Sequence, residues 1–373
     1  MRCCKPIGRG ILRSFARLAS GSNRRSNRAR RIAIQAIVGL ASRRHPMTVR
    51  PIVMNEFMVP AADASDIDLY VRNKHPADLV CASEENIVLF VHGATYPAET
   101  SFDLPLNGLS WMDYIAQRGY DVYLMDVRGY GRSTRPAQMR QPPDQHPPIV
   151  DTSTAVRDVA TAIDFIAKRR GVGRLKLIGW SWGATVMACY TTRHNEHVAK
   201  LVLYAPQWLR KVDSLTDTGG KLGAYRTVTR DHARARWLTG VPEHKRSELI
   251  PPGWFEAWAD ATWATDAVGA APDPPVLRAP NGAVADTRAY WGAGKALYDP
   301  GEIRVPTLLV HAEWDADWPN DSFYAYFDRL VNAPYKRLVQ IGEGTHTVLM
   351  EKNRMQLFEA VQHFLEEELE VGR

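Results

Sequence analysis

Cysteine is scarce in this chain: 373 residues contain four, and Cys3 and Cys4 both stand near the N-terminus. Cys81 and Cys189 are left for the rest of the chain, and no C-x-x-C motif occurs. Two cysteines do not make a disulfide framework. The sequence therefore predicts reduced thiols with a structural role.

Acidic residues are missing from residues 1–46, which hold 12 of the 47 Lys and Arg residues and none of the 41 Asp and Glu residues. The other 327 residues therefore carry 35 basic against 41 acidic side chains, a net charge of −6, although the whole chain carries +6. The positive charge belongs to the N-terminal segment alone. We therefore expect no nucleic-acid partner for the rest of the chain.

Long apolar runs are also missing from this basic segment. Its only run, residues 32–41, is too short to cross a bilayer, so we expect no integral membrane span. Arg30-Arg31 precedes the run and weakly resembles a twin-arginine export signal. The alternatives are a disordered or mis-started extension, with Met47 as the start, or a basic arm that binds a surface. We expect a cytoplasmic protein, with export as the alternative.

Motifs for metals and nucleotides are incomplete. Residues 194–196 (His-Asn-Glu) lack the Pro-Cys-x-x-Cys partner of a zinc deaminase. Residues 292–295 (Gly-Ala-Gly-Lys) lack the spacing and final Ser or Thr of a phosphate-binding loop, and residues 129–131 lack the third glycine of a dinucleotide motif. We therefore expect no metal, nucleotide or other cofactor.

A G-x-S-x-G motif at residues 179–183 organises the rest of the chain. The apolar residues Leu175, Leu177 and Ile178 precede it and helix-compatible residues 184–190 follow, which predicts a strand, a sharp turn and a helix. The turn would lift the oxygen of Ser181 clear of the sheet. It would also place the backbone N–H of Trp182 at a helix N-terminus, where developing negative charge is stabilised.

Strand and helix patterns alternate along most of the chain, which favours an α/β fold with a mostly parallel sheet and helices on both faces. Strands are expected at residues 56–59, 68–71, 86–91, 121–125, 175–178, 201–204, 306–310 and 337–341. Helices are expected near residues 111–117, 156–166, 184–190, 323–331 and 358–365. The alternation breaks at residues 209–302, which predicts a helical insertion between two parts of one core, residues 47–208 and 303–373.

A serine alcohol becomes a good nucleophile only with a base in hydrogen-bonding reach. His346 follows the last predicted strand and precedes the last helix, which places it at the same sheet edge as Ser181. Glu313, Asp315 and Asp317 follow the preceding strand, and the order serine, acid, histidine is typical after such a turn. We choose Asp315 as the acid that orients the imidazole, with Asp317 as the second candidate.

Five landmarks in this order resemble the α/β-hydrolase superfamily, from about residue 50 to the C-terminus. They are His92-Gly93, the Asp-x-Arg-Gly-x-Gly-x-Ser segment at 126–133, the serine turn, Asp315 with Pro319, and His346. The resemblance implies that the backbone N–H of Ala94 is the second oxyanion donor and that residues 126–133 have a structural role. It also implies that residues 209–302 form a cap domain.

The serine nucleophile resembles esterases, lactonases, peptidases and carbon–carbon hydrolases. Residues 181–183 and 128–133 also resemble proline iminopeptidases, which carry a His-Gly-Gly-Pro loop where this chain has His-Gly-Ala-Thr at 92–95. We predict a serine hydrolase that cleaves a carboxylic ester or lactone through an acyl-enzyme. An aminopeptidase of the proline iminopeptidase type is the alternative, and a binding protein without catalysis is a third.

Tryptophans gather near the predicted site: Trp180 beside the nucleophile, Trp318 beside the acid and Trp258 in the insertion. We expect these three to bind a small, bulky, apolar substrate, since indole buries a large area. An aminopeptidase would instead need acids that hold an ammonium group. Glu256 and Asp260 share one helix face and are candidates, although charges at this spacing usually point to water. The sequence leaves the oligomeric state open.

Overall fold

The computed structural model describes residues 50–211 and 213–369. The interpretations of residues 1–46 concern a segment outside the described residues. No helix in the described part of the chain is long and apolar enough to cross a membrane.

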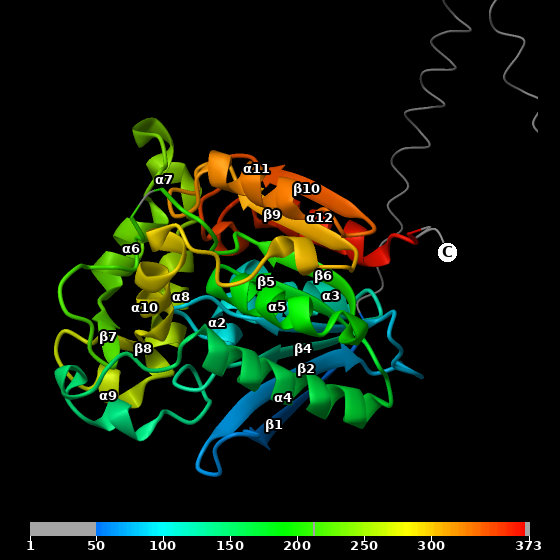
Figure 1. Cartoon of the computed structure of the whole chain (residues 1–373), viewed down its shortest axis with the longest axis horizontal. Helices are drawn as coiled ribbons and strands as arrows, with labels where there is room; N and C mark the ends of the chain where they lie inside the picture. Colours follow the sequence, from blue (N-terminus) through cyan, green and yellow to red (C-terminus); the bar gives the residue numbers. More distant parts are fainter. Residues whose placement is uncertain (1–49, 212, 370–373) are drawn as a thin grey trace, which may run out of the picture. The chain divides into compact units, whose positions relative to one another are not determined.

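Eight strands form one sheet in the order β1, β2, β4, β3, β5, β6, β9, β10 (Figure 1). The strands are Ile52–Pro60 (β1), Asp68–Pro76 (β2), Ile87–Val91 (β3), Asp121–Met125 (β4), Leu175–Trp180 (β5), Val198–Tyr204 (β6), Thr307–Ala312 (β9) and Lys336–Ile341 (β10). The β1–β2 and β2–β4 pairs are antiparallel, and the other neighbouring pairs are parallel. The predicted α/β fold with a mostly parallel sheet is confirmed.

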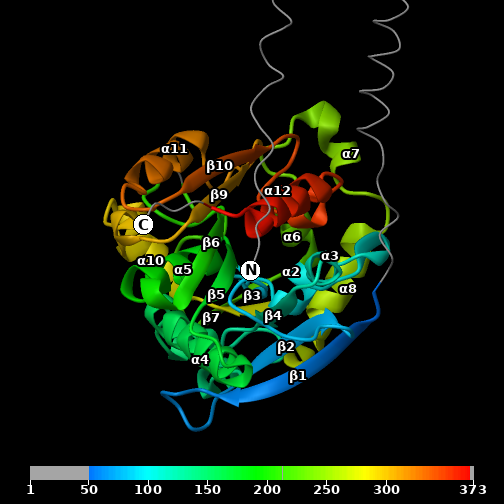
Figure 2. The ribbon, with the colours of Figure 1, turned by 90° about the vertical axis from the view of Figure 1, so that its right-hand side faces the viewer.

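The central strands are buried on both faces, as their continuous apolar sequences predict. Every residue of β3, β4 and β5 is buried. Helices α4 and α5 lie on one face of the sheet, and α3 and α12 lie on the other (Figure 2). The core helices are Ala98–Phe102 (α2), Trp111–Ala116 (α3), Thr152–Arg170 (α4), Trp182–Arg193 (α5), Asn320–Arg329 (α11) and Arg354–Glu366 (α12).

Helix α4 illustrates how local sequence sets these boundaries. The side chain of Asp151 caps its start by accepting a hydrogen bond from Thr154 N. Gly171 ends it with φ of 67°, a left-handed conformation that glycine adopts without strain. Val159, Ile163 and Ile166 recur at helical spacing and are all buried.

The helices and strands of residues 209–302 that Figure 1 labels lie to one side of the sheet. They are Arg230–Trp237 (α6), Arg246–Leu249 (α7), Trp254–Ala264 (α8), Ala267–Ala270 (α9) and Gly282–Ala289 (α10), with Tyr225–Val228 (β7) and Leu277–Pro280 (β8). The antiparallel β7–β8 pair was not predicted, because each strand has only four residues and joins a partner far away in sequence. The division into a core and a cap domain stays a prediction.

The parallel strands bring their carboxyl ends to one edge of the sheet. Ser181 follows β5 directly, and the loops at 92–97, 313–319 and 342–347 follow β3, β9 and β10. The insertion contacts this edge, where the rings of Tyr96 and Trp258 lie 4.7 Å apart. The residues predicted to carry the chemistry therefore meet beneath the insertion.

Candidate active site

Ser181 adopts a strained backbone conformation between β5 and α5, with φ of 58° and ψ of −124°. Positive φ is uncommon for a residue with a Cβ atom, and it persists only where neighbouring structure holds it. Ser181 N donates to Tyr204 O over 2.8 Å, and Ser181 O accepts from Ala184 N over 3.0 Å. These bonds fix the turn that presents the hydroxyl.

The flanking glycines are required by close backbone approach. A Cβ atom on Gly179 would lie 2.5 Å from the Cα of Ala184, and one on Gly183 would lie 2.3 Å from the carbonyl oxygens of Val91 and His92. Each distance is far below van der Waals contact. The G-x-S-x-G spacing therefore reflects the packing of helix α5 against β3 and β5.

His346 and Asp315 form a hydrogen-bonded pair beside this turn. His346 Nδ1 lies 2.8 Å from Asp315 Oδ2, and Asp315 Oδ1 accepts from Asp317 N and Trp318 N over 2.9 and 3.1 Å. A carboxylate accepts the Nδ1 proton, which leaves the lone pair on Nε2. That nitrogen is buried, has no hydrogen-bond partner within the described residues, and belongs to a side chain that lines one cavity with Ser181.

Asp317, the second candidate for the acid, makes different contacts. Its oxygens accept from Arg210 over 3.1 Å and from Arg236 over 3.0 Å, and it lies 4.0 Å from His346 Nε2. Burial works against its charge, but the attraction of basic neighbours, Arg236 first, holds the pKa of this carboxyl well below its usual range. Of the two acids, Asp315 is the one in contact with Nδ1.

The backbone carbonyl of His346 is held from the sheet. Trp180 Nε1 donates to it over 2.9 Å, and the hydroxyl of Tyr204 donates over 2.7 Å. Trp180 also lines the cavity that contains Ser181 and His346. Its indole thus positions the histidine loop, a role the sequence did not indicate, and it faces the space in which we predicted substrate contact.

The predicted oxyanion loop lies directly against the nucleophile. A Cβ atom on Gly93 would be 3.1 Å from Ser181 Cβ, and Ala94 lines both cavities beside Ser181. His92 Nε2 accepts from Val127 N over 3.1 Å, so its Nδ1 donates to Gly93 O over 2.7 Å. Burial lowers the pKa of His92, which favours this neutral form.

The backbone N–H of Trp182 opens helix α5, where the first N–H groups have no partner within the helix. The Trp182 indole points away, donating to Thr152 Oγ1 over 2.9 Å. On the opposite side, Ala94 O accepts from Tyr130 Oη over 2.9 Å and from Arg226 over 2.7 Å. Both predicted donors thus border Ser181, and the loop that carries Ala94 is anchored to strand β7 of the insertion.

Two small cavities meet at Ser181, Ala94 and Arg236, and each has a volume of about 10 Å³. A space of this size holds about one water molecule. A substrate therefore has to displace side chains of the insertion in order to enter.

The two remaining tryptophans of the prediction lie in the core. Trp258 is fully buried against Tyr96 and Trp237, and Trp318 is fully buried against His311 and other rings. Neither lines a cavity at Ser181. A role for them in substrate binding stays a prediction.

Glu351, which the sequence analysis did not single out, is buried beneath the histidine loop. Its carboxylate accepts from Thr345 N over 3.0 Å, from the Thr345 hydroxyl, and from the Thr347 hydroxyl over 2.7 Å. These residues flank His346, so Glu351 fixes the loop from behind. Burial raises the pKa of Glu351 to about 7.

We expect Glu351→Gln to remove a pH dependence of stability. The folded protein keeps the Glu351 proton to higher pH than the unfolded chain, whose carboxyl has a pKa of 4.5. The contribution of this group to the free energy of unfolding is fully present below pH 4.5. This contribution falls by roughly 3 kcal/mol as the pH rises through about 7. Urea unfolding across this range should show the wild-type advantage over the variant shrinking with pH. An advantage that stays constant would contradict the assignment.

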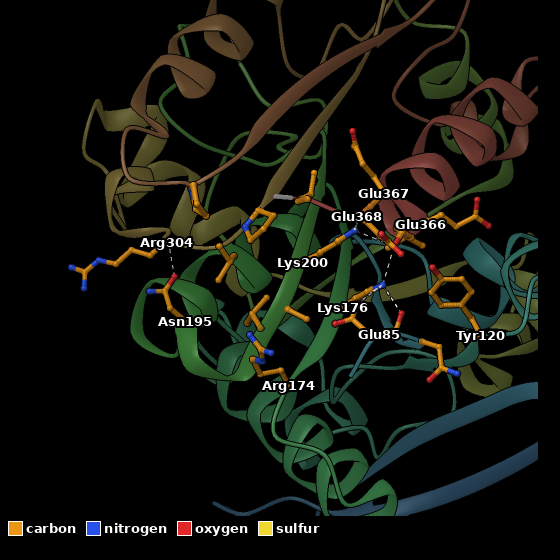
Figure 3. Close-up of a pocket in the computed structure, with 18 of the residues that line it drawn as sticks. Glu85, Tyr120, Arg174, Lys176, Asn195, Lys200, Arg304, Glu366, Glu367 and Glu368 are labelled. Carbon is orange, nitrogen blue, oxygen red and sulfur yellow. Dashed lines mark hydrogen bonds and ion pairs between the residues drawn. The ribbon is translucent and has the colours of Figure 1, made fainter. Parts of the chain in front are cut away.

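A large cavity, with a volume of about 930 Å³, lies at the opposite edge of the sheet (Figure 3). Lys176 and Lys200 at the starts of β5 and β6 border it. Both ammonium groups donate to carbonyl oxygens at the end of α12, including Leu365 O over 2.9 and 3.1 Å. These lysines stabilise a helix C-terminus, and the cavity holds none of the predicted catalytic residues.

One group of possible metal ligands comes together in the described part of the chain: His194, Glu196 and His197, with ligand atoms within 4.8 Å of one another. The two imidazoles are stacked with an interplanar angle of 3°. Parallel rings do not direct their lone pairs at a common point. The group is separate from Ser181, and the expectation of no metal or cofactor stays a prediction.

A family model described as the alpha/beta hydrolase fold matches residues 86–353. A proline iminopeptidase from Neisseria gonorrhoeae is 23% identical over 249 residues, which cover 60% of this chain and 74% of that protein. A serine hydrolase involved in carbazole degradation superposes with a TM-score of 0.55 at 18% identity, over 84% of this chain and 99% of that one. A thermophilic esterase from Thermogutta terrifontis superposes with a TM-score of 0.52 at 16% identity, over 83% of this chain and 98% of that one.

Proposed function

The chain belongs to the α/β-hydrolase fold family, and on this basis we propose that it is a serine hydrolase that cleaves a carboxylic ester or lactone. The observation that supports this most strongly is the hydrogen bond between His346 Nδ1 and Asp315. His346 also lines one cavity together with Ser181. Nucleophile, orienting acid and base then follow one another along the chain in the order that this fold uses. The reaction would need only these side chains, two backbone donors and water.

In the first half of the proposed reaction, Ser181 Oγ attacks the carbonyl carbon while His346 Nε2 takes the hydroxyl proton. The C–O bond to the alcohol then breaks, and the imidazolium returns the proton to the leaving oxygen. An acyl group remains on Ser181. Asp315 keeps the imidazole in the correct tautomer and stabilises its charged form.

In the second half, His346 Nε2 takes a proton from a water molecule while the water oxygen attacks the acyl carbon. The bond from this carbon to Ser181 Oγ then breaks, and the imidazolium returns the proton to Oγ, which releases the acid and restores the Ser181 hydroxyl. Negative charge develops on the carbonyl oxygen in both halves. The backbone N–H groups of Trp182 and Ala94 are the donors we propose for it. Losing one such donor typically slows turnover by about 10²–10³-fold.

An aminopeptidase is the second candidate, because the chain resembles proline iminopeptidases. Such an enzyme needs acids that face the nucleophile to hold the substrate's ammonium group. Glu256 and Asp260 have 59% and 70% of their side chains exposed and pair with Arg234 and Arg230. Their position on the outer face of α8 favours the esterase.

We expect the double variant Glu256→Gln with Asp260→Asn to change turnover of a p-nitrophenyl ester by less than about threefold, since surface ion pairs contribute little. Proline p-nitroanilide should be a poor substrate for the wild type. Both substrates should be measured with both proteins. Efficient cleavage of the anilide by the wild type, lost in the double variant, would favour the peptidase instead.

A further inference from the structure

The two cavities at Ser181 differ in chemistry and in their relation to His346. His346 lines only the first, whose wall includes Tyr96 and Trp180. The second lies beside Trp182 and is bordered by polar side chains: Gln207, Ser214, Thr216, Thr287, Arg236 and Asp317. In the proposed reaction His346 protonates the leaving alcohol, so the first cavity is on the leaving-group side. The second is then on the acyl side.

One residue that lines the polar cavity has a hydrogen-bond donor without an acceptor. Gln207 is 6% exposed, and its Oε1 accepts from Arg210 Nη1 over 2.8 Å. Its Nε2 has no acceptor among the described residues. A buried amide N–H₂ without a partner carries a free-energy penalty, which an acceptor on a bound substrate would remove.

The charges at this cavity favour a negative ligand. Asp317 shares its carboxylate between Arg210 and Arg236, so these three groups together carry one positive charge. Asp317 Oδ1 accepts from Arg210 and from Leu215 N over 3.1 Å each, and Oδ2 accepts from Arg236 over 3.0 Å, so both oxygens are engaged. Arg236 reaches the Thr95 hydroxyl at 3.5 Å, and Arg236 lines the cavity beside Ser181.

A second guanidinium, that of Arg226, lines neither cavity but holds the loop that carries Ala94. Arg226 donates to Ala94 O over 2.7 Å, to Thr95 Oγ1 over 2.9 Å and to Pro280 O over 2.7 Å. These acceptors are neutral, and no carboxylate in the described part of the chain forms an ion pair with it. Asp315, the other acid of the site, is occupied by His346 and backbone N–H groups and lines neither cavity.

We propose that Arg236 and Gln207 bind a carboxylate on the acyl chain of the substrate, so that the preferred substrates are half-esters of dicarboxylic acids. The inference rests on the proposed serine-hydrolase function and specifies its substrate class. The carboxylate accepts from the guanidinium of Arg236 and the amide of Gln207. The alcohol part lies against Tyr96 and Trp180.

The test compares mono-4-nitrophenyl adipate with its neutral methyl ester. Wild-type kcat/KM should be about tenfold or more higher for the half-ester, the size expected for a charge-assisted hydrogen bond. Arg236→Gln should bring the ratio of the two kcat/KM values close to one, and Arg236→Lys should restore part of it. Arg234→Gln, on the same helix but paired with exposed Glu256, is the matched control and should leave the ratio unchanged.

Gln207→Glu provides a second variant that keeps the acceptor for Arg210 and replaces the free donor with negative charge. It should lower the ratio below the wild-type value. Equal kcat/KM for the two esters in the wild type, or an unchanged ratio in both variants, would overturn the anionic subsite while leaving the hydrolase intact. Hydrolysis of neither ester by the wild type would instead contradict the proposed function.

Discussion

Replacing Ser181 with alanine is expected to abolish ester hydrolysis while leaving the fold intact. The change removes one oxygen atom, and the backbone bonds to Tyr204 and Ala184 that hold the turn do not involve the side chain. Losing the nucleophile of a triad typically lowers kcat by about 10⁶-fold. Steady-state kinetics with a p-nitrophenyl ester, with circular dichroism and thermal unfolding alongside, would measure both effects.

Ser153→Ala is a matched control, because Ser153 is an exposed serine on helix α4. It should retain wild-type activity. Activity of Ser181→Ala within about tenfold of the wild type would show that another residue is the nucleophile.

Replacing Asp315 with asparagine is expected to slow turnover by about 10⁴-fold, as for the corresponding change in the best-studied triad. The asparagine amide can still accept from Asp317 N and Trp318 N through its oxygen. Its N–H₂ group then faces His346 Nδ1, which favours the tautomer with the proton on Nε2, so the imidazole no longer acts as a base toward Ser181. Single-turnover kinetics should locate the loss in the chemical steps.

Asp317→Asn is the informative comparison, because Asp317 is equally buried and lies two residues away. It should slow turnover much less than Asp315→Asn, since Asp317 contacts Arg210 and Arg236 and is 4.0 Å from His346 Nε2. The reverse ranking would show that Asp317 is the acid.

Those parts of the fold that depend on short-range pattern could be predicted from the sequence. The strand expected at residues 121–125 is β4, and the helix expected at 111–117 is α3, one residue shorter. The serine turn could also be predicted, because Gly179 and Gly183 are needed wherever backbones approach this closely. The alternation of strands and helices then predicted that this turn and the loops after β3, β9 and β10 lie at one edge of the sheet.

Residues that only the folded chain brings to the site could not be predicted. Arg236 belongs to a helix of the insertion with no readable motif, and only the folded chain brings it to Asp317. Gln207 is buried where it accepts a hydrogen bond from Arg210, and Glu351 is buried where it accepts one from Thr345 N. The periodicity of the sequence does not reveal these contacts. The sequence also did not reveal the neighbours of Trp258, whose indole is buried against Tyr96 and Trp237.

The central claim, that Ser181 is the nucleophile of a serine hydrolase, is tested most directly by covalent labelling. The wild-type protein and Ser181→Ala would be treated with a fluorophosphonate probe, digested and mapped by mass spectrometry. The proposed mechanism predicts one adduct, on Ser181 of the wild type, and none on the variant. Absence of an adduct on the wild type, or equal labelling of another residue in both proteins, would contradict it.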